Sequence, residues 1–303
     1  MTDLTLPANI AVNIDILSDN FHRSKNISVS MLRLDKIHPV LSGNKIFKLF
    51  FFLEEAKHST HKKIITFGGA YSNHLAATAF ACKISEIKCI GIIRGEKPEK
   101  LSHTLEYCIQ NGMQTEFIKR SDYKKVNDYS FTENLKKKYG DHTLIPEGGF
   151  SEKGVMGAAM IGNYYGQEQY SHVCCPIGTA TTFAGLIQIN KNNKVIGFSV
   201  LKNLIDIGER LQYLNISPTS QYEVNHEYHF GGYAKENEEL FSFMNSFYEE
   251  NKISLDFVYT AKMMFGVYDL VKNNYFPPGS NILCIHTGGL QGNKSLASEK
   301  LKF

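Results

Sequence analysis

The sequence predicts an α/β protein built around a parallel sheet with helices on both faces. Short, almost wholly apolar runs alternate with longer runs whose apolar residues recur at helical spacing, and this alternation continues through most of the 303 residues. Glycines follow several of the apolar runs, as expected where a buried strand turns towards a helix. The length allows about two domains of ordinary size.

The first half of the chain opens the alternation. Strands are expected over 62–69, 87–95 and 114–120, where β-branched and other apolar residues cluster. Helices are expected over 73–85 and 100–112, where apolar residues return every three or four positions. Each of the first two strands is thus followed by a segment that can cover the sheet.

The same period continues through the second half. The expected elements are strands over 142–149, 171–178, 194–201 and 281–289, and helices over 152–166 and 181–190. The strand segments over 142–149 and 281–289 end in glycine turns. The segment 202–250 is more polar and rich in tyrosine, so its helices are not placed by the pattern.

Composition excludes several classes of function. The net charge of +3 is spread along the chain, with no basic block beyond short runs such as 136–138, which disfavours nucleic acid as a partner. The N-terminus lacks the pattern of a signal peptide, and no apolar run reaches the roughly 18 residues of a membrane span. We therefore expect a soluble cytoplasmic protein that binds neither nucleic acid nor membrane.

The cysteines favour a reduced protein without a metal site. None of the six forms a CxxC pair, and several lie inside apolar runs. Buried free thiols are the expected state of Cys82, Cys89, Cys108, Cys174, Cys175 and Cys284.

The stretch "LSGNKIFKLFFFLEEA" at 41–56 places two lysines one helical turn apart. Lys45 and Lys48 share a face, and apolar residues fill most of the remaining circumference of the helix. One alternative is that both ammonium groups reach water while their stems cover apolar surface. The other is burial, which lowers the pKa of a lysine and makes its amine nucleophilic.

Three polar turns have a possible common purpose. "GGAYSNH" at 68–74 could supply helix caps through its serine and asparagine, and "CIHTGGLQG" at 284–292 could merely end a strand. "PIGTATTFAG" at 176–185 combines small residues with hydroxyl groups at the start of a helix, which suits phosphate, although it is neither a Walker loop nor GxGxxG. Together with a candidate nucleophilic lysine, these turns indicate pyridoxal phosphate as a cofactor.

Five stretches in order carry a resemblance to a known family: "SGNKIFKL", "GGAYSNH", "GTATTFAGL", "LDFVYTAKMMFGVYDL" and "IHTGGL". They closely resemble the D-cysteine desulfhydrase and 1-aminocyclopropane-1-carboxylate deaminase family of pyridoxal-phosphate enzymes. The resemblance implies a tryptophan-synthase-β-like fold of two three-layer α/β domains with the cofactor between them. It also implies a larger domain from 1–47 and 162–303, a smaller inserted domain from 48–161, and a homodimer.

The resemblance also assigns roles to residues. Lys45 would hold the cofactor and move the substrate proton, with Lys48 in support. Asn73 would bond the phenolic oxygen of the cofactor, and together with Ser72 and His74 it would face the substrate carboxylate. The implied phosphate-binding residues are Gly178, Thr179, Ala180, Thr181 and Thr182. The implied catalytic group is completed by Ser72, Tyr259 and Tyr233, with Thr260 facing the pyridine nitrogen and Thr287 also at the cofactor.

Two positions depart from the pattern of the family. Phe47 stands where an arginine is usual, so the ion pair of that arginine must be absent or come from elsewhere. His74 stands where a glutamine is expected. It would still donate a hydrogen bond to the substrate, but its charge would vary with pH.

Two threonines favour one activity of the family. Deaminases of the family are expected to carry glutamate at the position of Thr260 and leucine at that of Thr287. The chain is therefore expected to eliminate sulfide from D-cysteine, giving pyruvate and ammonia. The alternatives are 1-aminocyclopropane-1-carboxylate deamination to 2-oxobutyrate and ammonia, a racemase or another β-eliminating enzyme, and a non-enzymatic α/β ligand-binding protein.

Overall fold

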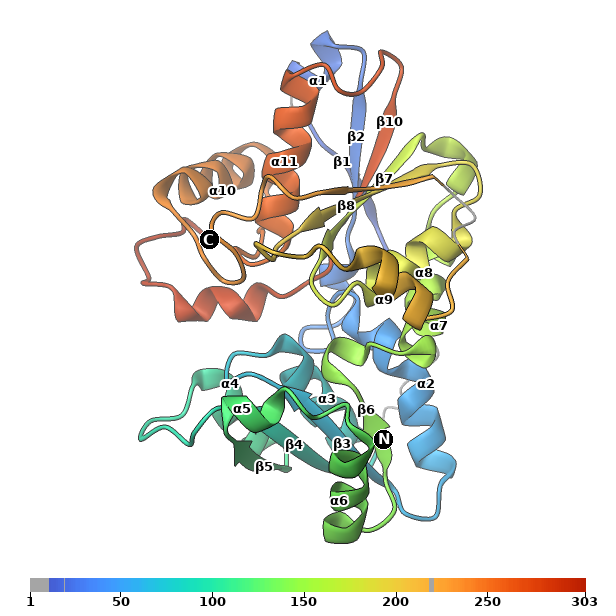
Figure 1. The fold of residues 1–303 in the computed structure, drawn as a ribbon. Helices are drawn as coiled ribbons and strands as arrows, with labels where there is room; N and C mark the ends of the chain where they lie inside the picture. The colour runs from blue at the N-terminus through green and yellow to red at the C-terminus, as the bar shows by residue number, and fades with distance from the viewer. Residues whose placement is uncertain (1–10, 19, 218–220) are drawn as a thin grey trace.

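In the computed structural model, which describes residues 11–18, 20–217 and 221–303, the chain forms two sheets, the larger above the smaller in Figure 1. The six-stranded sheet has the order β1-β2-β10-β7-β8-β9, and the four-stranded sheet has the order β5-β4-β3-β6. Every neighbouring pair is parallel except β1 and β2. The predicted parallel-rich α/β fold is confirmed.

The strands of the smaller sheet come from one continuous stretch of chain. They are β3 (Lys63–Gly68), β4 (Lys88–Arg94), β5 (Met113–Ile118) and β6 (Thr143–Ile145). The strands of the larger sheet come from before and after that stretch. They are β1 (Ile14–Ile16), β2 (Ser28–Leu32), β7 (His172–Ile177), β8 (Lys194–Ser199), β9 (Tyr222–Asn225) and β10 (Asn281–Ile285).

Eleven α-helices connect and cover these strands within the described residues. They are α1 (Asn20–Ser24), α2 (Lys45–His58), α3 (Asn73–Ile84), α4 (His103–Gln110), α5 (Arg120–Tyr123), α6 (Tyr129–Tyr139), α7 (Glu152–Ala159), α8 (Thr181–Ile189), α9 (Ile207–Tyr213), α10 (Glu238–Asn251) and α11 (Thr260–Lys272). Short 3-10 turns lie at η2 (Leu34–Lys36), η3 (Glu147–Gly149), η4 (Met160–Tyr164), η5 (Gln167–Gln169) and η6 (Leu290–Ser295).

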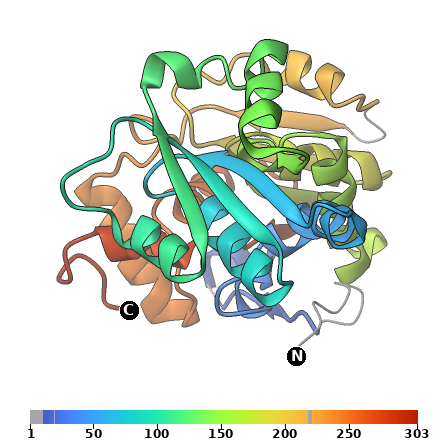
Figure 2. The same cartoon turned by 90° about the horizontal axis from the view of Figure 1, so that it is seen from below.

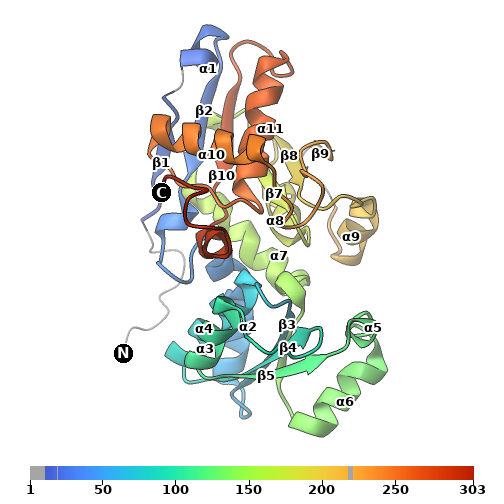
Figure 3. The same ribbon diagram turned by 90° about the vertical axis from the view of Figure 1, so that its left-hand side faces the viewer.

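The smaller sheet is covered on both faces. Successive residues of a strand point to opposite faces, so Ile64 joins the core under α2, α3 and α4 while Ile65 joins the core under α5 and α6. Figure 3 shows these two groups of helices on either side of the sheet, and Figure 2 views its strands from below. Burial on both faces explains why its strands read as continuous apolar runs.

The larger sheet follows the same rule. Cys175 faces the core shared with α7 and α8, and the neighbouring Cys174 faces the core shared with α10 and α11. All six cysteines are buried and free, as predicted. The core that contains Cys175 extends into the smaller sheet, so a single hydrophobic cluster joins the two halves of the molecule.

The structure differs from the sequence-based elements in a few places. The helix expected over 152–166 ends as α7 at Ala159 and continues as η4. The expected domain boundaries, 47/48 and 161/162, fall inside α2 and η4. Strands β1, β2 and β9 are short or partly polar and were not placed by the apolar pattern.

Candidate active site

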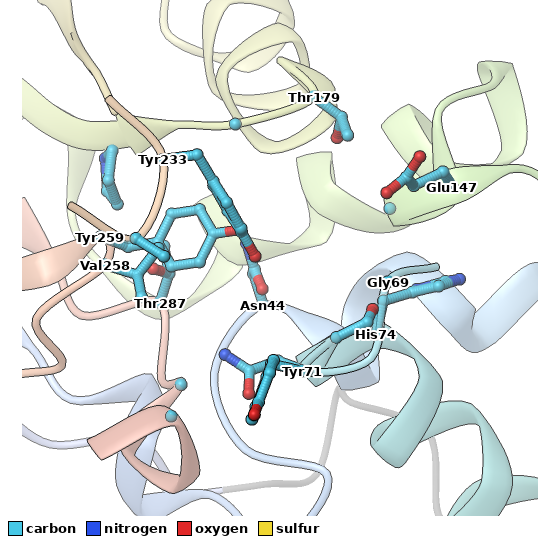
Figure 4. Close-up of a pocket in the computed structure, with 18 of the residues that line it drawn as sticks. Asn44, Gly69, Tyr71, His74, Glu147, Thr179, Tyr233, Val258, Tyr259 and Thr287 are labelled. Atoms are coloured by element: carbon cyan, nitrogen blue, oxygen red, sulfur yellow. The ribbon is translucent and has the colours of Figure 1, made fainter. Parts of the chain in front are cut away.

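A cavity of about 770 Å³ lies between the two sheets, and Figure 4 shows part of its lining. Its walls come from the turns after β3, β6, β7 and β10, together with residues at the ends of β4 and β5. Parallel strands bring their carboxyl ends to one edge, which places these turns around a common space. The volume is typical of small-molecule sites, which span roughly 300–1,000 Å³.

Lys45 and Lys48 both line this cavity from the first turn of α2. Burial lowers the pKa of Lys45 to about 8, although the charge of Asp256 partly opposes the shift. Burial, followed by the charge of Lys45, lowers the pKa of Lys48 well below its usual value. Lys48 is thus buried and Lys45 half-buried in the cavity, and the lowered pKa makes both amines more available as nucleophiles or bases than an exposed lysine.

The residues before Lys45 are fixed against two other turns. Gly43 has a φ of +68°, and a Cβ there would lie 1.9 Å from the carbonyl oxygen of Thr287, so only glycine fits. Asn44 Nδ2 donates to Thr182 Oγ1 at 2.7 Å, and Asn44 Oδ1 accepts from Lys45 Nζ at 2.6 Å. Asn44 therefore links the lysine to the first turn of α8.

Ser72 and Asn73 lie at the start of α3 and line the cavity. Ser72 Oγ accepts from the amide of Leu75 at 3.3 Å, so it is a helix cap. Asn73 Oδ1 accepts from Gln291 Nε2 at 2.8 Å, and this hydrogen bond fixes the orientation of the Asn73 side-chain amide. The cap still leaves the Ser72 hydroxyl hydrogen as a donor, so capping and substrate binding are compatible.

His74 lines the cavity from the first turn of α3 and is bonded to the smaller sheet. Thr66 Oγ1 donates to the carbonyl of Ile145 at 3.0 Å, so it accepts from His74 Nε2 at 2.8 Å. Burial, and then the charges of Lys48 and Lys45, lower the pKa of His74 to about 3. His74 is therefore neutral near pH 7 with its proton on Nε2, and Nδ1 can only accept a hydrogen bond.

The turn between β7 and α8 presents the start of α8 to the cavity. Ala180 has a left-handed φ of +73° and supplies no side-chain cap to the helix. The hydroxyl oxygens of Thr179 and Thr181 lie 3.0 Å apart. A Cβ on Gly178 would lie 3.2 Å from the ring of Tyr259, so glycine allows a close approach. Uncapped amides, a helix N-terminus and clustered hydroxyl groups suit a phosphate group.

Two tyrosines stand together at this cavity. The rings of Tyr233 and Tyr259 meet edge to face with centroids 6.0 Å apart. Burial raises the pKa of Tyr259 well above its usual value, and burial also raises that of Tyr233. Both hydroxyl groups therefore keep their protons near neutral pH. Tyr233, 45% exposed, lies where the cavity opens.

The two threonines expected at the cofactor differ in position. Thr287 follows β10 and lines the cavity. Thr260 is fully buried and is not among the described residues that line it. Its hydroxyl donates to Asp256 Oδ1 at 2.6 Å, while its amide donates to the same oxygen at 2.9 Å. The structure therefore gives Thr260 a role in the start of α11, directly after Tyr259.

Several charged residues of the cavity were missed by the sequence reasoning. Arg94 ends β4, Arg120 begins α5, and Glu147 follows β6, and all three line the cavity. Tyr123 Oη donates to Glu147 at 3.0 Å, and the guanidinium of Arg94 lies 5.6 Å from the centre of the Tyr123 ring. Their positions at the carboxyl ends of predicted strands were the signal that could have found them.

Phe47 lies between the two lysines in sequence but outside the cavity lining of the described residues. It is fully buried, and its ring meets that of Tyr164 edge to face with centroids 5.5 Å apart. A Cβ on Gly157 would lie 2.1 Å from the carbonyl oxygen of Phe47, so α7 approaches α2 closely. Phe47 therefore belongs to helix packing, where an arginine would have to bury its charge.

An amine of lowered pKa near an uncapped helix start, in a cavity between two parallel-rich sheets, is typical of a pyridoxal-phosphate enzyme. The family model "Pyridoxal-phosphate dependent enzyme" matches residues 17–288. The chain belongs to this family, and its cofactor is pyridoxal phosphate. The residues present fit that group, because Lys45 offers the amine and the turn before α8 offers uncapped amides.

Named relatives divide between two activities. A putative 1-aminocyclopropane-1-carboxylate deaminase of Pyrococcus abyssi is 30% identical, over 93% of this chain and 90% of its own length. The mitochondrial bifunctional D-cysteine desulfhydrase/1-aminocyclopropane-1-carboxylate deaminase of Arabidopsis thaliana is 28% identical, over 83% and 70%. The D-cysteine desulfhydrase of Klebsiella pneumoniae is 25% identical, over 90% and 89%. The chain is thus an enzyme of the deaminase and desulfhydrase type.

Solved structures agree with this placement. The crystal structure of an ACC deaminase homologue superposes with a TM-score of 0.77 at 26% identity, covering 93% of this chain and 90% of that one. Threonine deaminase isoform 2 of Solanum lycopersicum superposes with a TM-score of 0.64 at 17% identity, over 94% and 82%, which is a likeness of fold. In the described parts of the chain, no helix is both long and apolar enough to cross a membrane.

Proposed function

We propose that the enzyme eliminates the β-substituent of a small amino acid, most readily converting D-cysteine to pyruvate, sulfide and ammonia. The observation that carries the choice of substrate is Thr287, which presents a threonine to the cavity where deaminases of the resembled family are expected to present leucine. When bound, pyridoxal phosphate supplies an aldehyde for the substrate amine and a ring that delocalises the electron pair left by the α-proton.

In this proposal each part of the cavity has one task. The Lys45 amine takes the α-proton, because its lowered pKa leaves a free electron pair on much of the protein near pH 8. The amides of residues 178–182 hold the cofactor phosphate. Asn73 bonds the phenolic oxygen of the cofactor, and Ser72 joins it at the substrate carboxylate. Tyr259, which keeps its proton, faces the leaving sulfur.

Elimination from cysteine balances without a further reactant except water. The α-proton goes to Lys45, the carbon–sulfur bond breaks, and sulfur leaves with the bonding electrons to be protonated. The three-carbon amino product then takes up one water and loses ammonia, giving pyruvate. Thiolate is a good leaving group, so no strong acid is required at the sulfur.

The second candidate is deamination of 1-aminocyclopropane-1-carboxylate to 2-oxobutyrate and ammonia. The names of four relatives at 27–30% identity, all putative 1-aminocyclopropane-1-carboxylate deaminases, favour it. Its substrate has no α-hydrogen, so the ring must be attacked or protonated by a side chain of the cavity. The expected homodimer and cytoplasmic location also remain part of the proposal, and sedimentation of the purified holoenzyme tests the former.

A substrate screen decides between the two activities. Purified holoenzyme is incubated with D-cysteine, L-cysteine, D-serine and 1-aminocyclopropane-1-carboxylate, and both keto acid and sulfide are measured. We expect pyruvate and sulfide from D-cysteine, with little product from the cyclopropane acid. Efficient release of 2-oxobutyrate without sulfide from D-cysteine would reverse the assignment. The Lys45→Ala variant, which removes the proposed base, is the control for non-enzymatic release.

A further inference from the structure

Helix α11 contains a buried lysine that the proposed reaction does not use. Lys262 is only 1% exposed and does not belong to the cavity lining among the described residues. Its Nζ donates to the carbonyl oxygens of His229 at 2.9 Å and Gly232 at 2.7 Å. Burial lowers its pKa to about 8, partly opposed by the charges of Asp256 and Glu236. Removing this amine from water is costly unless the two carbonyls compensate.

The loop that receives these hydrogen bonds has an unusual backbone. Phe230, Gly231, Gly232 and Ala234 all have left-handed φ values, at 51°, 89°, 120° and 53°. For Phe230 and Ala234 this conformation is disfavoured by contacts of the Cβ atom. Such residues keep strained angles only where their surroundings determine the backbone. Of the two carbonyls that Lys262 contacts, that of His229 lies directly before this segment and that of Gly232 lies within it.

Tyr233 stands inside that loop, directly after one of the two carbonyls. Its ring meets Tyr259 at a centroid distance of 6.0 Å and an interplanar angle of 72°. Tyr259 lies at the start of α11, three residues before Lys262. The same helix therefore positions Tyr259 through its own backbone and Tyr233 through the amine of Lys262.

We propose that Lys262 is a positioning residue, which fixes the loop 229–234 so that Tyr233 is held against Tyr259 where the cavity opens. The inference rests on the proposed function, in which both tyrosines act at the substrate. Loss of the amine leaves two carbonyls without this donor and frees the strained loop. The hydroxyl of Tyr233 then loses its fixed place, which lowers the rate of the reaction while the cofactor stays bound.

The test compares Lys262→Met with a matched control. Lys63→Met also removes a lysine that donates to a backbone carbonyl, that of Tyr139, but it lies at the start of β3 away from the cavity. Lys262→Arg keeps donors at the loop. Hydrogen exchange of the holoenzyme is followed for the amides of 230–235, and kcat, KM and cofactor affinity are measured with the substrate that the screen identifies.

For Lys262→Met we expect faster exchange confined to this loop, an about ten- to hundred-fold lower kcat, and cofactor affinity within about two-fold of the parent. Combined with Tyr233→Phe, it should add little further loss, because both changes remove one interaction. Lys262→Arg should recover part of the rate, and Lys63→Met should leave rate and loop exchange unchanged.

Unchanged loop exchange in Lys262→Met would overturn the proposal whatever the substrate proves to be. Fully additive losses with Tyr233→Phe would also overturn it, since Lys262 would then act elsewhere. Failure of both Lys262 variants to fold would make the amine a requirement of the fold and end its assignment to positioning. If the loop loosens but no substrate of the screen is turned over, the proposed function fails while the structural link stands.

Discussion

At the scale of single residues, the surroundings of each amine decide its charge. Lys45 and Lys48 are one turn apart and both lose water, yet only Lys45 is favoured in its charged form by a nearby carboxylate, Asp256. Lys48 instead feels the positive charge of Lys45. Sequence spacing predicts that the two share a face, but it does not reveal a carboxylate more than 200 positions away, so the difference between them is a tertiary property.

The first prediction is that Lys45 carries the cofactor. Borohydride reduction of the holoenzyme followed by peptide mapping should place the pyridoxyl label on Lys45, and Lys45→Ala should take up none. Because only the unprotonated amine attacks an aldehyde, the rate at which the apoenzyme binds the cofactor should rise with pH through about 8. A label on Lys48 would refute the assignment.

A second prediction concerns His74 and acid stability. Its pKa is about 3 in the folded protein and about 6.5 when unfolded, so the unfolded chain binds the extra proton first as pH falls. This group therefore weakens folding by about 1.4 kcal/mol per pH unit below 6.5, down to its folded pKa. Above pH 6.5 His74 is neutral in both the folded and the unfolded protein, so it does not reduce the free energy of unfolding there.

Replacing His74 with glutamine should remove that dependence, because the amide donates to Thr66 without titrating. Denaturant unfolding of both proteins at pH 7 and pH 4.5 measures the effect, and the parent should lose about 2–3 kcal/mol more than His74→Gln over this interval. Other titrating groups are common to both proteins and cancel in the difference. Equal losses would mean that His74 is protonated in the folded state.

At the scale of elements, apolar runs located most of the strands and helices that build the cavity. These apolar runs did not predict elements that bury few apolar residues. Helix α6 has Leu135 as its one fully buried residue and carries three consecutive lysines, so it lacks a strong apolar stripe. β9 is an edge strand with no fully buried residue. The start of α11 was recognised as a motif, but the capping carboxylate of Asp256 was not.

The third prediction follows from that cap. Asp256 accepts from the amides of Val258, Tyr259 and Thr260 as well as from the Thr260 hydroxyl. Thr260→Val removes the hydroxyl but keeps the shape, and should reduce the free energy of unfolding by about 1–3 kcal/mol. The absorbance of the bound cofactor should not change, because Thr260 lies outside the cavity lining. A shifted absorbance in a fully folded variant would restore Thr260 to the cofactor ring.

At the scale of the whole molecule, the two sheets were predictable and their junction was not. Alternation along the chain predicts parallel sheets, and ordered motifs predict a cofactor between them. The contacts that close the cavity join residues far apart in sequence, such as Asn44 with Thr182 and Asn73 with Gln291. No local pattern records them, because each depends on the way the smaller sheet lies against the larger one.

The last prediction uses this junction. The proposed cofactor site takes Lys45 from α2, Asn73 from the start of α3 and residues 178–182 from the turn after β7 and the start of α8, so bound cofactor ties together parts that must separate on unfolding. A ligand at 100 times its Kd adds about 2.7 kcal/mol to the free energy of unfolding. For a chain of this size, the melting temperature of the holoenzyme should exceed that of the apoenzyme by roughly 5 °C.

Thr182→Ala tests whether the turn before α8 carries this coupling. It removes the partner of Asn44 and one hydroxyl of the proposed phosphate cradle, so cofactor affinity should fall about ten- to a hundred-fold. The holoenzyme's gain in melting temperature at fixed cofactor concentration should then shrink by half or more. Thr132→Ala, which removes an exposed hydroxyl on α6, should leave the gain intact. An undiminished gain in Thr182→Ala would mean that backbone amides alone bind the phosphate, with Asn44 held by other contacts.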